Sequence, residues 1–70
     1  MINKFGKRLR ELRTEHGLSM KQLSVKVGIS DASISRWENF QTIVNADQLI
    51  TFSKFFNVST DYLLGLRDYD

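Results

Sequence analysis

Apolar side chains recur along the chain at spacings of three and four residues, the pattern of amphipathic helices, in five short segments. The first segment is predicted from Asn3 to His16, with one apolar stripe formed by Phe5, Leu9 and Leu12. Strand-like alternation never extends beyond a few residues, and no repeat or low-complexity stretch occurs. The pattern therefore predicts an all-α fold.

Polar caps and a glycine delimit the second segment. Ser19 and Gln22 form a capping box, in which the serine oxygen accepts from the third backbone N–H of the helix and the glutamine reaches back. Leu23 and Val27 are expected to face inward, and Gly28 ends the helix after about two turns.

The third segment is predicted as a helix from Asp31 to Glu38, with Ser30 as its N-cap. At about 100° per residue, Ile34 and Trp37 share one side, which we expect to be buried. The other side carries small residues and a single arginine, namely Ala32, Ser35 and Arg36, with Ser33 on the flank. Such a face is unusual for a plain surface helix.

Two further helices complete the pattern. Residues 40–44 are predicted as a loop, after which Asn45 caps the fourth helix and Asn57 ends it in a left-handed conformation. Ser59 caps a short fifth helix over residues 60–64. The apolar residues of these two helices are expected to complete the core: Leu49, Phe52, Phe56, Leu63 and Leu64.

Composition and charge narrow the class of protein. With 70 residues and no cysteine, we expect one domain without disulfides, zinc sites, other metals or cofactors. No apolar run approaches the ~20 residues of a membrane span, so we expect a cytoplasmic protein with no membrane contact. Residues 1–26 hold seven basic and two acidic residues (+5), and residues 27–70 hold three and six (−3). This asymmetry points mildly to an anionic partner on one side.

Only three residues, Gly28, Ile29 and Ser30, join the helices predicted over residues 20–27 and 31–38. The glycine supplies the left-handed position of a sharp bend, and Ile29 fills the gap between the helices. This is the helix-turn-helix arrangement, in which the second helix is presented to the major groove of DNA.

The sequence resembles the Cro and lambda-type repressor helix-turn-helix domains, also called the XRE family. The resemblance covers nearly the whole chain and rests on three stretches, Leu23–Ser30, Ile34–Asn39 and Phe56–Gly65. It implies a five-helix lambda-repressor-like DNA-binding domain over residues 1–70, with its core at about 3–65 and its helix-turn-helix motif at about 19–39. It further implies a sequence-specific regulator of transcription, most simply a repressor that binds double-stranded DNA, and not an enzyme.

The resemblance also assigns DNA contacts position by position. Contacts to bases are expected from Asp31, Ala32, Ser33 and Arg36. Contacts to phosphates are expected from Ser19, Met20 through its amide, Lys21, Gln22, Ser30, Ser35 and Asn39. Backbone N–H groups at a helix N-terminus suit an anionic oxygen in any case.

Each assigned side chain has a structural interpretation beside the functional one. Arg36 can donate two hydrogen bonds to a guanine, contact a phosphate, or remain solvated. Asp31 can accept from a cytosine or stabilise the helix N-terminus through the helix dipole. Ala32 can touch a thymine methyl or permit close approach, and the serines can bind phosphate or cover an exposed face.

Arg13 and Glu38 are expected to pair as the family often does, bracing the first helix against the third. Two positions depart from the family pattern. Met20 stands where glutamine is common and offers only its amide and apolar packing, and Phe40 stands where glycine is common. The loop over residues 40–45 has neither charge nor proline, so its apolar residues either close over the core or bind a protein partner.

A domain this small reads few base pairs, so we expect a homodimer on a palindromic operator. Spare apolar residues for the dimer surface are Ile50, Phe55, Tyr62 and Leu66, of which Tyr62 can equally complete the core. The alternative function is a protein-interaction module of the same fold, such as an antitoxin or an anti-repressor partner. The lone imidazole, His16, sits at a helix end, where a solvated cation is favourable, so catalysis is not expected.

Overall fold

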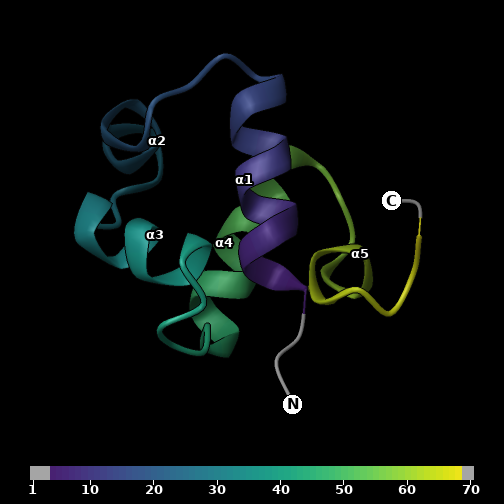
Figure 1. Cartoon of the computed structure of the whole chain (residues 1–70). Coiled ribbons are helices and arrows are strands. Elements are labelled where there is room, and N and C mark those ends of the chain that lie inside the picture. Colours follow the sequence, from purple (N-terminus) through teal and green to yellow (C-terminus); the bar gives the residue numbers. More distant parts are fainter. Residues whose placement is uncertain (1–3, 69–70) are drawn as a thin grey trace.

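Five helices make up the computed structural model, which describes residues 4–68 (Figure 1). They are α1 (Phe5–Glu15), α2 (Met20–Val27), α3 (Asp31–Glu38), α4 (Ala46–Phe56) and α5 (Thr60–Leu64). The predicted all-α class and the order of the helices are therefore confirmed. Asn3, the predicted start of the first helix, lies outside the described residues. The predicted end at His16 is wrong by one residue, because His16 is the C-cap of α1.

Side-chain caps open the last four helices, as the sequence predicts. In each, the oxygen of the capping residue accepts from the backbone N–H three residues on: Ser19 from Gln22, Ser30 from Ser33, Asn45 from Gln48 and Ser59 from Tyr62. Such a cap is worth about 1 kcal/mol, so these short helices begin at defined residues.

Helix α1 ends in a Schellman motif that directs the chain toward α2. The Leu18 N–H donates to the Arg13 carbonyl, and the Gly17 N–H donates to the Thr14 carbonyl. Gly17 has a φ of +67°, which a side chain would oppose. Leu18 is thereby turned back onto the core.

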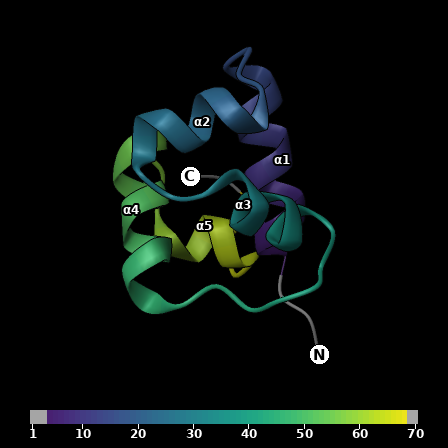
Figure 2. The same ribbon diagram turned by 90° about the vertical axis from the view of Figure 1, so that its left-hand side faces the viewer.

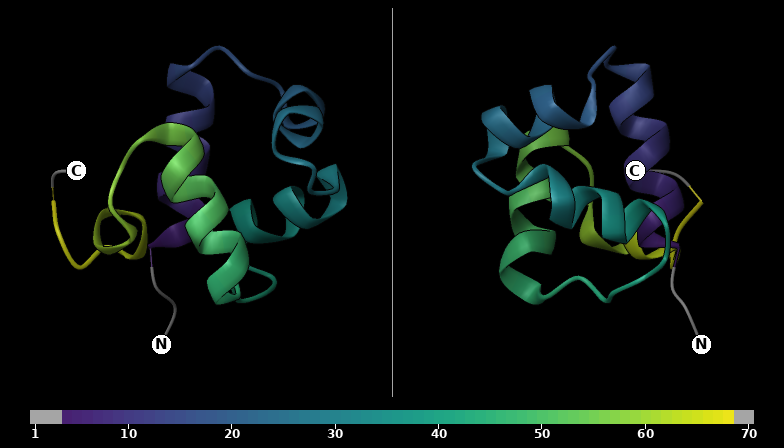
Figure 3. Two further views of the ribbon diagram at one scale, coloured as in Figure 1. Left: turned by 180° about the vertical axis from the view of Figure 1, so that it is seen from behind. Right: turned by 60° about the vertical axis from the view of Figure 1, so that its left-hand side comes forward.

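The α2–α3 pair and α5 lie on opposite sides of the α1–α4 pair (Figures 1 and 3). Helix α1 packs on α3 and α5, α2 packs on α3 and α4, and α4 packs on α5. The six largest fully buried side chains come from all five helices: Phe5, Leu9, Leu23, Ile34, Phe52 and Leu63.

Edge-to-face aromatic contacts lock α3 into this frame. The Trp37 ring centroid lies 5.8 Å from that of Phe5 on α1 and 5.7 Å from that of Phe52 on α4. Each such pair contributes roughly 0.5–1.5 kcal/mol beyond its buried area. Helix α3 is therefore held from both sides along its inner face.

The observed core differs from the predicted one at a few positions. Leu49 and Leu64 are half-buried, whereas Val58, which the pattern did not indicate, is buried. Asn57 takes the predicted left-handed conformation (φ 56°), and the Val58 N–H donates to the Ser53 carbonyl. This turn points Val58 inward at a position that helical spacing does not reveal.

Candidate nucleic-acid interface

The turn between α2 and α3 has the predicted geometry. Gly28 has a φ of +72°, and its N–H donates to the Ser24 carbonyl. Open space surrounds the position where a Cβ would lie, so glycine is required here for its backbone conformation and not for lack of room. Ile29 packs against the core and holds the two helices at their bend. Figure 2 shows α2 and α3 side by side on one face of the domain.

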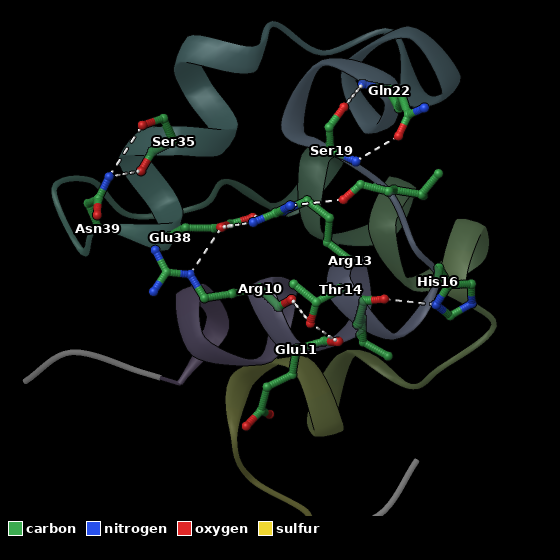
Figure 4. A network of polar contacts seen from close by, with 12 residues as sticks. Arg10, Glu11, Arg13, Thr14, His16, Ser19, Gln22, Ser35, Glu38 and Asn39 are labelled. Carbon is green, nitrogen blue, oxygen red and sulfur yellow. Dashed lines mark hydrogen bonds and ion pairs between the residues drawn. The ribbon is translucent and has the colours of Figure 1, made fainter.

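The N-terminus of α2 leaves two backbone donors for an outside acceptor. In the capping box, the Gln22 N–H donates to Ser19 Oγ at 3.0 Å and the Ser19 N–H donates to Gln22 Oε1 at 2.8 Å (Figure 4). The amides of Met20 and Lys21, between them, begin the helix and have no intrahelical acceptor. The Met20 side chain packs against the core, whereas Lys21 is exposed. This end of α2 can therefore bind an anionic oxygen through backbone N–H groups and one lysine.

Helix α3 presents the predicted reading residues on its outer side. Asp31, Ala32 and Arg36 are exposed, and Ser33 is half-exposed. The inner side is buried, with Ile34 at 0% and Trp37 at 4% exposure. Ala32 and Arg36 thus share the accessible side of a well-anchored helix, with Asp31 and Ser33 at its two edges.

The hydroxyl groups of α3 already have partners within the protein. Ser30 Oγ accepts from the Ser33 N–H and donates to Ser33 Oγ at 3.0 Å. Asn39 Nδ2 donates to the Ser35 carbonyl at 2.9 Å and to Ser35 Oγ at 3.2 Å (Figure 4). Any phosphate contact from these side chains must therefore add to, or replace, a hydrogen bond that stabilises the ends of the helix.

Glu38 at the end of α3 holds two arginines of α1. Its carboxylate is fully buried and accepts from Arg13 Nε at 2.7 Å and from Arg13 Nη2 at 2.9 Å. Arg13 Nη1 also donates to the Leu18 carbonyl at 2.9 Å. The hydrogen bond to Glu38 raises the pKa of the Arg13 guanidinium above its ordinary value, against a smaller opposing effect of burial.

The predicted ion pair is thus present, and the sequence analysis missed its third member. Arg10 Nε donates to Glu38 Oε1 at 3.3 Å (Figure 4). The sequence spacing could have indicated this contact, because Arg10 lies three residues before Arg13 and on the same side of α1.

Helix α1 approaches the C-terminal end of α3 at Gly6, another position that the sequence analysis missed. A Cβ on Gly6 would lie 2.0 Å from the Trp37 carbonyl oxygen. No side chain fits there, so Gly6 sets the distance between α1 and the last turn of α3.

Arg8 is buried beneath α5, and the sequence analysis assigned it no role. Its guanidinium carbon lies 4.1 Å from the centroid of the Tyr62 ring, and Nη2 lies 3.8 Å from Asp68 Oδ1. Tyr62 also packs against the core. Of the two roles left open for Tyr62, this contact favours completion of the monomer.

The other predicted dimer residues expose apolar surface. Ile50 is 46%, Phe55 37% and Leu66 73% exposed. Ile50 and Phe55 lie about 140° apart around the axis of α4, so they face different directions. These two residues of α4 therefore do not share one face of the helix, and the dimer surface stays a prediction.

The loop after α3 contains Phe40, which stands where glycine is common in the family. Phe40 adopts the left-handed conformation (φ 60°) that favours glycine. Val44 packs against the core, whereas Phe40 is 51% and Ile43 84% exposed. Of the two uses left open for the apolar loop residues, Val44 thus closes over the core and the other two do not.

The described part of the chain holds no group of three metal-ligating side chains, and none of its helices could cross a membrane. His16 Nδ1 lies 2.8 Å from the Leu12 carbonyl, and the ring packs edge-on against Phe56. The imidazole therefore has a structural place at the end of α1.

The model of the Helix-turn-helix family matches residues 9–63. The chain is 41% identical over 61 residues to the uncharacterized HTH-type transcriptional regulator YobD of Bacillus subtilis, an alignment that covers 87% of this chain and 54% of that protein. The chain therefore spans about half the length of this relative. Its fold is similar to that of the P22 c2 repressor in complex with a synthetic operator, with 37% identity, a TM-score of 0.79, and coverage of 86% of this chain and 91% of that one. It is also similar to the restriction-modification controller protein C.AhdI of Aeromonas hydrophila, with 32% identity, a TM-score of 0.77 and the same coverage.

Proposed function

The chain belongs to the Helix-turn-helix family of DNA-binding transcriptional regulators, and from this premise we propose that it represses transcription by reading double-stranded DNA with α3 in the major groove. The observation that carries the proposal is the outer face of α3. Asp31, Ala32 and Arg36 are exposed together on a helix whose inner face is buried. A helix this well anchored can enter a groove as a rigid body.

Each exposed residue has a base that suits it. Arg36 donates in bidentate fashion to guanine O6 and N7, which discriminates against other bases by about 1–3 kcal/mol. Asp31 accepts from the amino group of a cytosine, and Ala32 contacts a thymine methyl. Ser33, half-exposed on the flank, contributes at the edge of the groove.

Phosphate contacts on either side of the groove set the register of α3. At one end are the free amides of Met20 and Lys21 together with the capping residues Ser19 and Gln22. The others come from α3 itself and the residue after it, through Ser30, Ser35 and Asn39. The +5 charge of residues 1–26, which hold α1 and most of α2, favours approach to the DNA backbone from this side.

One recognition helix reads too few base pairs for useful specificity, so we place the protein on a palindromic operator as a homodimer. Exposed apolar surface for the dimer comes from Ile50 and Phe55 on α4 and from Leu66, which follows α5. Tyr62 contributes at most its edge, because it packs on the core and beneath Arg8. A regulator of this kind acts in the cytoplasm, on DNA, and needs neither catalysis nor a cofactor.

Selection of bound sequences from random duplex DNA tests this function. The protein is expected to enrich a site with two symmetric halves, and Arg36→Ala is expected to lose its preference at one guanine in each half. Lys54→Ala is the matched control, since it removes an exposed positive charge from α4 and should leave the selected sequence unchanged. No enrichment by the unmodified protein would refute sequence-specific binding. A uniform loss by Arg36→Ala across all sequences would make Arg36 a phosphate contact.

A protein-interaction module of the same fold is the second candidate. The exposed Phe40 and Ile43, on an uncharged loop, favour it. The double change Phe40→Ser and Ile43→Ser separates the two functions: loss of a co-purifying partner with DNA binding intact would support the second one.

A further inference from the structure

The single negative charge of the buried Glu38 carboxylate is paired with two positive charges, those of Arg10 and Arg13. Arg13 alone neutralises it through a two-point contact. The three donor nitrogens of Arg13 are all used, since Nη1 donates to the Leu18 carbonyl, and its side chain is only 13% exposed. Arg10 adds a second cation, so the three side chains together carry a net charge of +1.

Arg10 keeps most of its guanidinium available. Its side chain is 55% exposed and is tied to Glu38 only through Nε. Within residues 4–68, no hydrogen bond or ion pair ends on its Nη1 or Nη2. A guanidinium held in this way presents the planar pair of N–H donors that matches two oxygens of a phosphate.

The position of Arg10 adds a reason for a cation at this point. Glu38 is the last residue of α3, and Asn39, a predicted phosphate contact, follows it directly. Figure 4 shows the guanidinium of Arg10 beside Glu38, on the side of α1 that faces the end of α3. A helix C-terminus carries partial negative charge and repels an anion. A positive charge at this point offsets that repulsion and so favours a phosphate beside Asn39.

We propose that Arg10 forms a phosphate-binding site for the DNA backbone at the C-terminal end of α3, with Glu38 as the positioning residue that orients its guanidinium. This inference rests on the proposed DNA-binding function. A single exposed guanidinium holds free phosphate weakly in water. When the N-terminus of α2 binds the DNA backbone, a second phosphate of the same DNA is held close to Arg10. We therefore assign the site to a backbone phosphate and not to free phosphate.

The salt dependence of DNA binding tests the site. The logarithm of the binding constant falls as the logarithm of salt concentration rises, and the steepness of this fall, here called the slope, is about 0.9 for each phosphate neutralised. Arg10→Gln keeps an N–H donor toward Glu38 but carries no charge, so the slope is expected to fall by about 0.9 per subunit. Arg10→Lys is expected to keep the slope, because a lysine contacts phosphate as a point charge. Lys54→Ala, an equal loss of charge on α4, should leave the slope unchanged.

Two controls make the outcome decisive. Circular dichroism at the assay temperature establishes that each variant is folded. Exchange of chloride for inorganic phosphate at constant ionic strength should change binding equally in the unmodified protein and Arg10→Gln. A stronger effect on the unmodified protein would assign the site to free phosphate and overturn the proposal. An unchanged slope in folded Arg10→Gln would overturn the Arg10 site and leave the proposed DNA-binding function standing. Failure of the unmodified protein to bind any duplex would overturn both.

Discussion

Replacement of Arg13 by alanine is expected to destabilise the fold severely, because it leaves a buried carboxylate with one long contact. The change removes both short hydrogen bonds to Glu38 and the one to the Leu18 carbonyl. Among residues 4–68, only the Arg10 contact to the carboxylate remains, with Nε at 3.3 Å from Glu38 Oε1. The Glu38 side chain has no exposure to water that could replace the lost donors.

The expected loss of stability follows from this geometry. Removing one partner of a buried ion pair costs about 3–5 kcal/mol. Arg10 still contacts Glu38 in the variant, so the lower end, about 3 kcal/mol, applies. A 70-residue domain has a total stability of roughly 3.5–10 kcal/mol. At about 4–8 °C per kcal/mol for a domain of this size, the melting temperature should fall by roughly 12–24 °C.

Thermal and urea unfolding, followed by circular dichroism, measure this loss. Lys7→Ala, an exposed position on the same helix, is the matched control and should change stability by no more than about 0.5 kcal/mol. The double variant Arg13→Ala with Glu38→Gln should lose less than the sum of the single losses, because no unpaired charge stays buried. An Arg13→Ala protein with unchanged melting temperature and unchanged DNA affinity would refute the bracing role of the pair.

The effect of Arg13 should not depend on pH near neutrality. The hydrogen bond to Glu38 raises the pKa of the Arg13 guanidinium above its already high ordinary value. The stabilisation is therefore fully present below the pKa of the unfolded chain and is lost only as pH rises through the folded value. The Arg13 contribution should be equal at about pH 6 and pH 9.

Three further substitutions test the frame around α3. Gly6→Ala should lower stability by at least 1–3 kcal/mol in urea unfolding, because its Cβ would meet the Trp37 carbonyl at 2.0 Å; an unchanged midpoint would show that α1 can shift freely. Phe40→Gly should raise the melting temperature modestly, since a left-handed non-glycine residue costs about 1–2 kcal/mol; a lower melting temperature would show that the Phe40 ring contributes more than this strain removes. Ser19→Ala should lower the free energy of unfolding by about 1 kcal/mol, because the Gln22 N–H loses its acceptor. If the cap also orders the phosphate site, the free energy of DNA binding should weaken by a similar amount.

Features that depend on neighbouring residues could be predicted from the sequence. The Ser19–Gln22 capping box, the Gly28 turn and the left-handed Asn57 all form as expected, because each is fixed by side chains within a few residues. The outward face of α3 followed from helical spacing alone once Trp37 was taken as buried.

Features that depend on distant contacts were not predicted. Gly6 looks like a costly glycine inside a helix until the crossing of α3 shows why no Cβ fits there. Arg8 and Arg10 look like solvated cations, because neither the Tyr62 ring nor the Glu38 carboxylate is near them in sequence. Cations become structural only where tertiary packing supplies a partner.

Chemical modification of guanine N7 tests the central claim, that α3 reads the major groove, most directly. N7 lies in that groove and is one of the two atoms that Arg36 is proposed to contact. Methylation of N7 at one guanine in each half of the selected site should abolish binding by the unmodified protein and leave the weaker binding of Arg36→Ala unchanged. Undiminished binding of the methylated site by the unmodified protein would contradict the account.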